Sequence, residues 1–271
     1  MEPQMEIKTI VTSDFEMDYA TFGSGPRNLA IIPGLSLRGV LESASTIEAA
    51  YKIFKADYTV YLFERKKDAD LGYSIPQMAS DTATALKAMG VEHVDVFGAS
   101  QGGMVGQYMA IRFPEMVDHL VLASSTSRAE PLQVEVIEHW ADLADVRQGS
   151  DLVNDFIEKA FSQKFLERYR RALQMMYRKL SESEMKRFSV MARACKFMDS
   201  FGELGKIKCP VFVIGASDDQ VVTYEASVKM AEKLKAENVP CEFYTYEGYG
   251  HAVFDEASDY RERVLDFLRN H

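Results

Sequence analysis

Short apolar runs alternate with longer amphipathic stretches along most of the chain. Each run has the length of a strand, and most are apolar at nearly every position, as strands covered on both faces require. The predicted strands span residues 28–33, 58–63, 93–97, 119–123, 210–214 and 241–246. Amphipathic stretches predict helices over residues 42–55, 76–89, 102–112, 224–237 and 256–270. This alternation predicts an α/β fold with a mostly parallel, doubly wound sheet.

Two regions depart from the alternation. Near the N-terminus, residues 6–12 and 15–22 predict an antiparallel pair of strands at the edge of the sheet. Between about residues 130 and 201 only helical periodicity is found, with apolar residues three and four positions apart. We expect this segment to form an all-helical cap over the C-terminal edge of the sheet, where open α/β sheets bind ligands. The predicted domains are a core of residues 1–127 and 206–271 and a cap of residues 128–205.

Composition narrows the classes of protein. The chain has 271 residues and a formal net charge of −10, which argues against nucleic acid or an anionic membrane as a partner. No apolar run is long enough to span a bilayer, and the N-terminal MEPQMEIKTI lacks the pattern of a signal peptide. The three cysteines have no metal-binding spacing, and we expect reduced thiols in a cytoplasmic protein.

The strongest chemical signal is the turn between the strand at 93–97 and the helix at 102–112. Its sequence, Gly98-Ala-Ser100-Gln-Gly102, fits the G-x-S-x-G pattern in the strand–turn–helix context that a nucleophilic serine needs. Gly98 and Gly102 relieve crowding in the tight turn, and Gly103 lets the helix pack close to the neighbouring strands. The alternatives are an N-capping serine or a phosphate-binding loop.

A nucleophilic serine needs a general base and an acid that orients it. Of the five histidines, His251 lies in a loop after the last predicted strand, on the same edge of the sheet as Ser100. The strand at 210–214 is followed by Asp218 and Asp219, whereas the strand at 119–123 is followed only by hydroxyl residues. One of the two aspartates is therefore the expected acid, and the other is expected to be a turn or capping residue.

The loop after the strand at 28–33 is the expected source of an oxyanion-hole donor. Gly34 lets the backbone turn the next N–H inward, so the N–H groups of Leu35 and Gln101 are the predicted pair of donors. Because these are backbone groups, their side chains are expected to matter less.

These motifs together resemble the α/β-hydrolase superfamily, in its capped serine esterase and lactonase branch. The resemblance covers the whole chain and rests on FGSGPRNLAIIPG, VDVFGASQGGM, RFPEMVDHLVLAS, VFVIGASDDQVV and YEGYGHAVFDE. In relatives the acid stands three residues after the glycine that ends its strand, which selects Asp218. The sequence departs from the family at Pro33, where a histidine is usual, and at Gln220, where proline often follows the acid.

The resemblance implies a hydrolase that acts on a small or medium carboxylic ester, lactone or thioester through an acyl-enzyme on Ser100, with no metal or cofactor. The partner is a small-molecule substrate. Alternatives on the same scaffold are a ligand-binding receptor or sensor with slow or no turnover, an acyltransferase, a perhydrolase and a hydrolase of carbon–carbon bonds.

The composition of the predicted cap gives indications about the charge of the substrate and the lining of its pocket. Between residues 159 and 196 there are eleven Lys or Arg and three Glu, a pattern typical of a solvated helix face or of attraction to an anionic substrate. Apolar cap residues would form the pocket ceiling or simply the cap's own core. The candidate pocket residues are Trp140, Met176, Phe188 and Met191.

Overall fold

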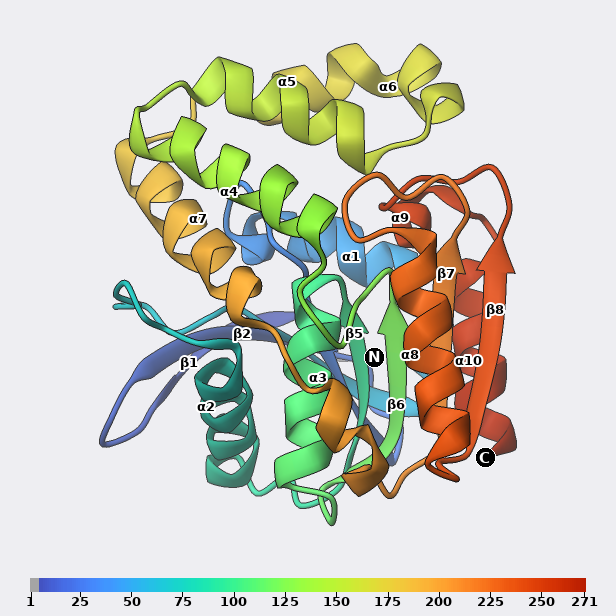
Figure 1. The fold of residues 1–271 in the computed structure, drawn as a ribbon. Coiled ribbons are helices and arrows are strands. Elements are labelled where there is room, and N and C mark those ends of the chain that lie inside the picture. The colour runs from blue at the N-terminus through green and yellow to red at the C-terminus, as the bar shows by residue number, and fades with distance from the viewer. Residues whose placement is uncertain (1–4) are drawn as a thin grey trace.

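An eight-stranded sheet forms the centre of the molecule, in a computed structural model that describes residues 5–271 (Figure 1). The first four residues of the N-terminal stretch considered above lie outside the described residues. The strand order is β1-β2-β4-β3-β5-β6-β7-β8. The strands are β1 (Glu6–Val11), β2 (Glu16–Phe22), β3 (Arg27–Ile32), β4 (Tyr58–Phe63), β5 (Val94–Ala99), β6 (Val117–Ala123), β7 (Val211–Ala216) and β8 (Cys241–Tyr246). β1 and β2 pair antiparallel, β2 also runs antiparallel to β4, and β3 to β8 are parallel to one another.

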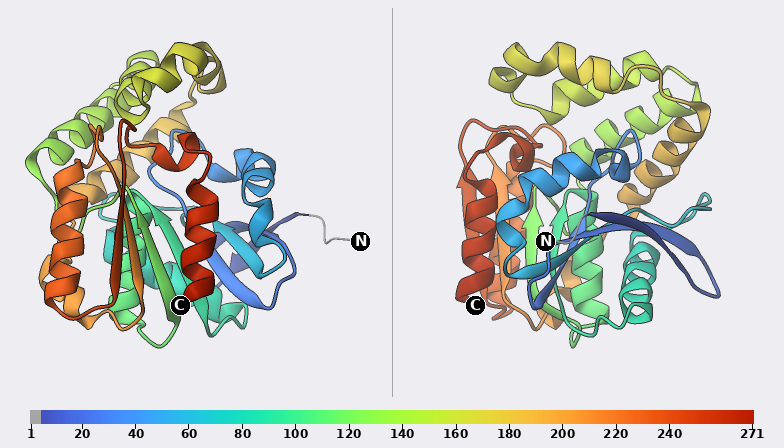
Figure 2. Two further views of the ribbon diagram at one scale, coloured as in Figure 1. Left: turned by 90° about the vertical axis from the view of Figure 1, so that its right-hand side faces the viewer. Right: turned by 180° about the vertical axis from the view of Figure 1, so that it is seen from behind.

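Helices cover both faces of this sheet, because the strand side chains alternate between two hydrophobic clusters. Along β5, Val96 packs into the cluster of α2 (Ile75–Ala88), α3 (Gln101–Arg112) and α8 (Tyr224–Ala236). The next residue, Phe97, packs with α1 (Ala44–Ala50) and α10 (Tyr260–Asn270) on the opposite face (Figure 2). The predicted α/β class and doubly wound arrangement are therefore confirmed.

Four helices lie between β6 and β7 in the sequence and sit beyond the carboxyl ends of the parallel strands (Figure 1). They are α4 (Pro131–Asp145), α5 (Gly149–Ala160), α6 (Gln163–Met176) and α7 (Glu182–Ala194). Shorter 3₁₀ turns, η3 (Cys195–Phe197) and η4 (Phe201–Lys206), lead back to the sheet. The all-helical character of this insertion agrees with its periodicity, and we call α4 to α7 the cap helices. Among residues 5–271, no helix combines the length and apolarity needed to cross a bilayer.

The predicted helix over residues 42–55 is broken in the structure. It consists of the turn η1 (Val40–Ser43), helix α1 and the turn η2 (Lys52–Phe54). A second short helix, α9 (Val253–Glu256), precedes α10, whereas the sequence predicted one helix over residues 256–270.

Candidate active site

Ser100 lies between β5 and α3, at the carboxyl end of the parallel strands. Its backbone has φ 51° and ψ −117°, a sparsely populated conformation for a residue with a side chain. Its N–H donates to the carbonyl oxygen of Ala123 at 2.8 Å, and its own carbonyl accepts from the Ser125 hydroxyl at 2.9 Å. The strained turn is therefore held by its neighbour β6, and the side chain is lifted out of the sheet towards the loops.

Glycines allow the backbone to come this close. A Cβ on Gly98 would lie 2.4 Å from the carbonyl oxygen of Gly102, and one on Gly102 would lie 1.9 Å from that of Ile32. A Cβ on Gly103 would lie 2.6 Å from the side chain of Ser125, and one on Gly34 would lie 3.1 Å from the Cβ of Ser100. Each of the four predicted glycines thus occupies a place where a larger residue would push apart the elements around Ser100.

His251 is in hydrogen-bonding contact with Ser100. The His251 Nε2 atom lies 2.9 Å from Ser100 Oγ, and His251 Nδ1 lies 2.8 Å from Oδ2 of Asp219. The loop that carries His251 turns at Gly248, which has φ 74° and donates its N–H to Ser217 Oγ at 2.8 Å. The three side chains form one connected chain, and each of the three residues is less than a tenth exposed.

Asp218 was expected to contact His251, and the structure shows that this expectation is wrong by one residue. The Asp218 side chain is exposed, and its Oδ1 accepts only from the neighbouring Ser217 hydroxyl, at 2.7 Å. The predicted strand ended before Gly215, but β7 continues in register with β8 to Ala216. The turn that follows closes through the N–H of Asp219 on the carbonyl of Ala216, so Asp219 is the aspartate that faces inward. Its second oxygen, Oδ1, accepts from the N–H groups of Val221 and Val222.

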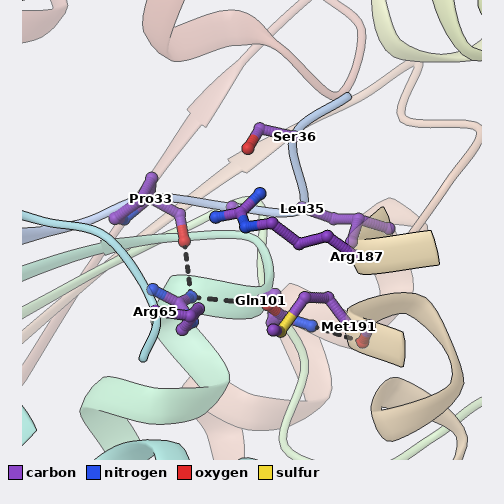
Figure 3. A pocket seen from close by; sticks show the side chains of 8 residues that line it. Pro33, Leu35, Ser36, Arg65, Gln101, Arg187 and Met191 are labelled. Carbon is purple, nitrogen blue, oxygen red and sulfur yellow. Dashed lines mark hydrogen bonds between the residues drawn. The ribbon is translucent and has the colours of Figure 1, made fainter. Parts of the chain in front are cut away.

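The loop after β3 meets the start of α3 at a small pocket (Figure 3). Leu35 and Gln101, which carry the two predicted oxyanion donors, both line it, together with Pro33, Gly34, Ser36, Arg65, Arg187 and Met191. Its volume is about 10 Å³, roughly the room that one water molecule needs. The two predicted donors thus belong to segments that meet directly beside Ser100.

Arg65 is a member of this site that the sequence did not reveal. It stands in the charged run ERKK, which resembles an ordinary solvated loop, yet its side chain is buried. Its Nη2 donates to the carbonyl of Pro33 at 2.8 Å, and burial lowers the pKa of its guanidinium to about 10. Its position two residues after a buried strand was the one available signal.

The four candidate pocket residues have different surroundings. Trp140 packs against Phe156 in the cap, with ring centroids 4.9 Å apart and planes tilted by 47°, and donates its Nε1–H to Asp155. Phe188 is buried against the same Phe156, so both aromatic residues pack within the cap, which favours the alternative that they form its own core. Met176 is 52% exposed on α6 and is likewise not a lining residue of the small pocket, whereas Met191 is one.

Many cations of the basic cap segment are paired with acids. Arg193 bonds to Asp142 and Asp145 of α4, and Arg170 pairs with Glu158 of α5. A larger pocket of about 460 Å³ lies within the cap helices and includes Arg178 and Lys179 among its lining residues. Part of the charge of this segment therefore serves contacts between helices, and most of the pairs are exposed enough to be worth little individually.

Comparison with known proteins identifies the family of this chain. The model of the alpha/beta hydrolase fold family matches residues 34–258, a span that contains Ser100, Asp219 and His251. The chain belongs to the alpha/beta hydrolase fold family.

Two curated relatives of this alpha/beta hydrolase carry different activities in their names. It is 26% identical to a 3-oxoadipate enol-lactonase of Acinetobacter baylyi, over 79% of this chain and 80% of that one. It is 25% identical to a putative carbamate hydrolase of Rhizobium rhizogenes, over 79% of this chain and 83% of that one. Among solved structures, the enol-lactonase of Burkholderia xenovorans has a TM-score of 0.83 at 17% identity and covers 97% of this chain and 100% of that one. The structural likeness shows the shared fold, and the named relatives are hydrolases.

Proposed function

We propose that this protein is a serine hydrolase that cleaves a small or medium carboxylic ester, lactone or thioester. The observation that carries the proposal is the unbroken hydrogen-bond chain from Asp219 through His251 to Ser100. Nucleophile, base and orienting acid are thus within reach of one another in the order that acyl transfer requires. The enol-lactonase named among the relatives supports a cyclic or open ester as the substrate class.

In the proposed reaction, His251 Nε2 takes the proton of the Ser100 hydroxyl as Oγ attacks the substrate carbonyl carbon. Asp219 accepts the Nδ1–H of His251, which fixes the tautomer and stabilises the imidazolium that forms. The N–H groups of Leu35 and Gln101 would stabilise the negative oxygen of the tetrahedral intermediate. His251 then protonates the leaving alcohol, and a water molecule repeats the sequence to release the acid and restore Ser100.

The first test replaces the nucleophile. Ser100→Ala should reduce hydrolysis of short p-nitrophenyl esters and of simple lactones to the level of the buffer control, because no acyl-enzyme can form. Circular dichroism and the melting temperature should stay close to those of the unchanged protein. A fluorophosphonate probe should label the unchanged protein and not Ser100→Ala. Turnover that persists in the purified variant would contradict the assignment.

A receptor or sensor on the same scaffold predicts a different time course. It would release about one equivalent of product per molecule and then stop, with a large rise in melting temperature on adding the ligand. A hydrolase gives sustained turnover under the same conditions. Active-site titration followed by steady-state measurement therefore separates the two functions.

A further inference from the structure

The side chain of Gln101 is buried between the core and the cap, although only its backbone N–H was expected to matter. Its Nε2 donates to the carbonyl oxygen of Met191 on α7 at 2.7 Å and lies 3.2 Å from the sulfur of Cys195. Only 1% of Gln101 is exposed, and it is the residue directly after Ser100. Burial raises the pKa of the Cys195 thiol to about 11, so the sulfur is uncharged at neutral pH. The amide group of Gln101 thus connects the start of α3 to a cap helix.

The other end of this amide connects to the loop after β3 through Arg65 (Figure 3). The Arg65 Nη2 atom lies 3.4 Å from Gln101 Oε1 and 2.8 Å from the carbonyl oxygen of Pro33. Pro33 is two residues before Leu35, the other predicted donor. One guanidinium nitrogen therefore holds both segments that supply the oxyanion hole.

The same cap helix is fixed to this corner by ion pairs. Arg187 of α7 pairs with Glu64, the residue next to Arg65, and Glu184 lies 3.4 Å from the guanidinium of Arg38. Glu64 also accepts from the N–H of Leu41 at 3.1 Å. The two turns of α7 that precede Met191 are thus held against the core by ion pairs.

We propose that the Gln101 side chain is a positioning residue that, together with Arg65, sets the geometry of the oxyanion hole against cap helix α7. The assignment rests on the proposed serine hydrolase function. An oxyanion hole works because its donors are held in place before charge develops, and a misplacement of about 1 Å can cost about a hundredfold in rate. The network Met191–Gln101–Arg65–Pro33 supplies that constraint through the side chains of Gln101 and Arg65.

The test compares Gln101→Met with the same substitution at another buried glutamine of α3. Gln101→Met keeps the length of the side chain and removes its hydrogen bonds to Met191 and Arg65. We expect kcat on a p-nitrophenyl ester to fall about ten- to a hundredfold while KM changes little, since the loss is of transition-state positioning. The inhibition constant of a trifluoromethyl ketone, which forms an oxyanion on Ser100, should rise by the same factor as kcat/KM falls.

Gln107→Met is the matched control. Gln107 lies on the same helix, is fully buried, and bonds through its side chain to Gly103, Thr126 and Ser200, away from the loop after β3. It should lower the melting temperature by a similar amount and leave kcat per titrated active site unchanged. Equal kcat and equal inhibition constants in the Gln101 and Gln107 variants would overturn the assignment.

Arg65 provides an independent pair of variants should Gln101→Met fail to fold. Arg65→Met should lower kcat in the same way, and Arg65→Lys should restore most of it because an ammonium can still donate to the Pro33 carbonyl. Failure of the lysine variant to restore kcat above the methionine variant would count against the network. Ser100→Ala is measured alongside these variants. Turnover that survives in Ser100→Ala overturns the proposed function. If Ser100→Ala loses turnover and Gln101→Met keeps full activity, the positioning role alone is overturned.

Discussion

At the scale of single residues, two adjacent aspartates have opposite surroundings. Asp219 is buried and uses both carboxylate oxygens, one on His251 Nδ1 and one on the N–H groups of Val221 and Val222. Asp218 is exposed and bonds only to the Ser217 hydroxyl through its side chain. The difference in burial and partners, rather than the shared chemistry of the carboxylates, decides which one can serve His251.

Asp219→Asn is therefore expected to be the damaging change. The amide oxygen of Asn can keep the bonds to the two valine N–H groups, which leaves its NH₂ group facing His251 Nδ1. The imidazole would then hold its proton on Nε2 and could not accept the proton of Ser100. The equivalent change in a serine protease of another fold costs about ten thousandfold in turnover, and we expect a comparable loss of kcat here. Asp218→Asn should change kcat less than about threefold, since the exposed Asp218 side chain bonds to Ser217, whereas His251 bonds to Asp219. A crippled Asp218→Asn beside an active Asp219→Asn would contradict the geometry.

The sequence could narrow the acid to two neighbours and could not choose between them. The resemblance selected Asp218 by counting three residues from Gly215, taken as the last residue of the strand, whereas β7 ends one residue later at Ala216. The extra pairing of Ala216 with Tyr246 moves the start of the turn, and a shift of one residue there exchanges the inward and outward side chains. Pairing with β8 is a long-range contact, which local sequence does not encode. Ser100 and His251 were identifiable because their motifs and their positions after strands are local.

At the scale of elements, the site depends on how closely α3 approaches β3. A Cβ atom added at Gly102 would lie 1.9 Å from the backbone oxygen of Ile32. Backbone cannot move aside as a flexible side chain can, so the helix and the strand would have to separate.

Gly102→Ala should accordingly lower the free energy of unfolding by about 3 kcal/mol, at the upper end of overpacking effects. It should also reduce kcat, because Gly34 and Ser100 would move apart with the two elements. The matched control is Gly202→Ala in η4, where nothing lies within 4 Å of the added Cβ. Urea unfolding of both variants measures the difference. Equal stability of the two would show that the approach of α3 to β3 is not as tight as the structure has it.

Most elements followed from periodicity, and the exceptions have local physical causes. The stretch 40–54 ends in a 3₁₀ turn because Tyr51 and Phe54 both pack on the sheet, with ring centroids 5.5 Å apart. Residues three apart eclipse in a 3₁₀ turn and diverge in an α-helix, so the tighter turn lets both rings reach the same face. The amphipathic pattern of a sequence alone does not distinguish a 3₁₀ turn from an α-helix.

At the scale of the whole molecule, the cap helices contact both halves of the proposed machinery. On one side, α7 reaches Gln101 through Met191. On the other, the end of α5 accepts the N–H of Ala252, next to His251, at 2.7 Å on the carbonyl of Ala160. Two residues further on, the N–H of Ser162 donates to Glu256 at 2.8 Å. A change in the position of these helices would therefore be transmitted to the base and to the oxyanion hole together.

The opposite end of the sheet carries a cluster of charged side chains around the buried Asp95. His119 Nδ1 lies 2.6 Å from Asp95, which also pairs with Arg27 at 2.7 Å. Arg27 in turn donates to the carbonyl of Leu268 in α10, so the cluster joins strands β3, β5 and β6 to the C-terminal helix. The hydrogen bond to Asp95, against the opposing effect of burial, raises the pKa of His119 above its ordinary value of 6.5.

A raised folded-state pKa fixes the sign of the pH dependence. Protonated His119 is favoured in the folded state, so its stabilisation is fully present below the unfolded-state pKa of about 6.5 and is lost as pH rises through the folded-state pKa. As pH is raised above about 6.5, the urea concentration at the midpoint of unfolding should therefore decrease more steeply in the unchanged protein than in His119→Asn. Because the cluster lies at the start of the strands and Ser100 at their end, the variant should keep the pH profile of kcat. If the urea midpoints of the two proteins change with pH in parallel, His119 is not the cause of the pH dependence of stability. If the pH profile of kcat is altered in His119→Asn, the two edges of the sheet are coupled.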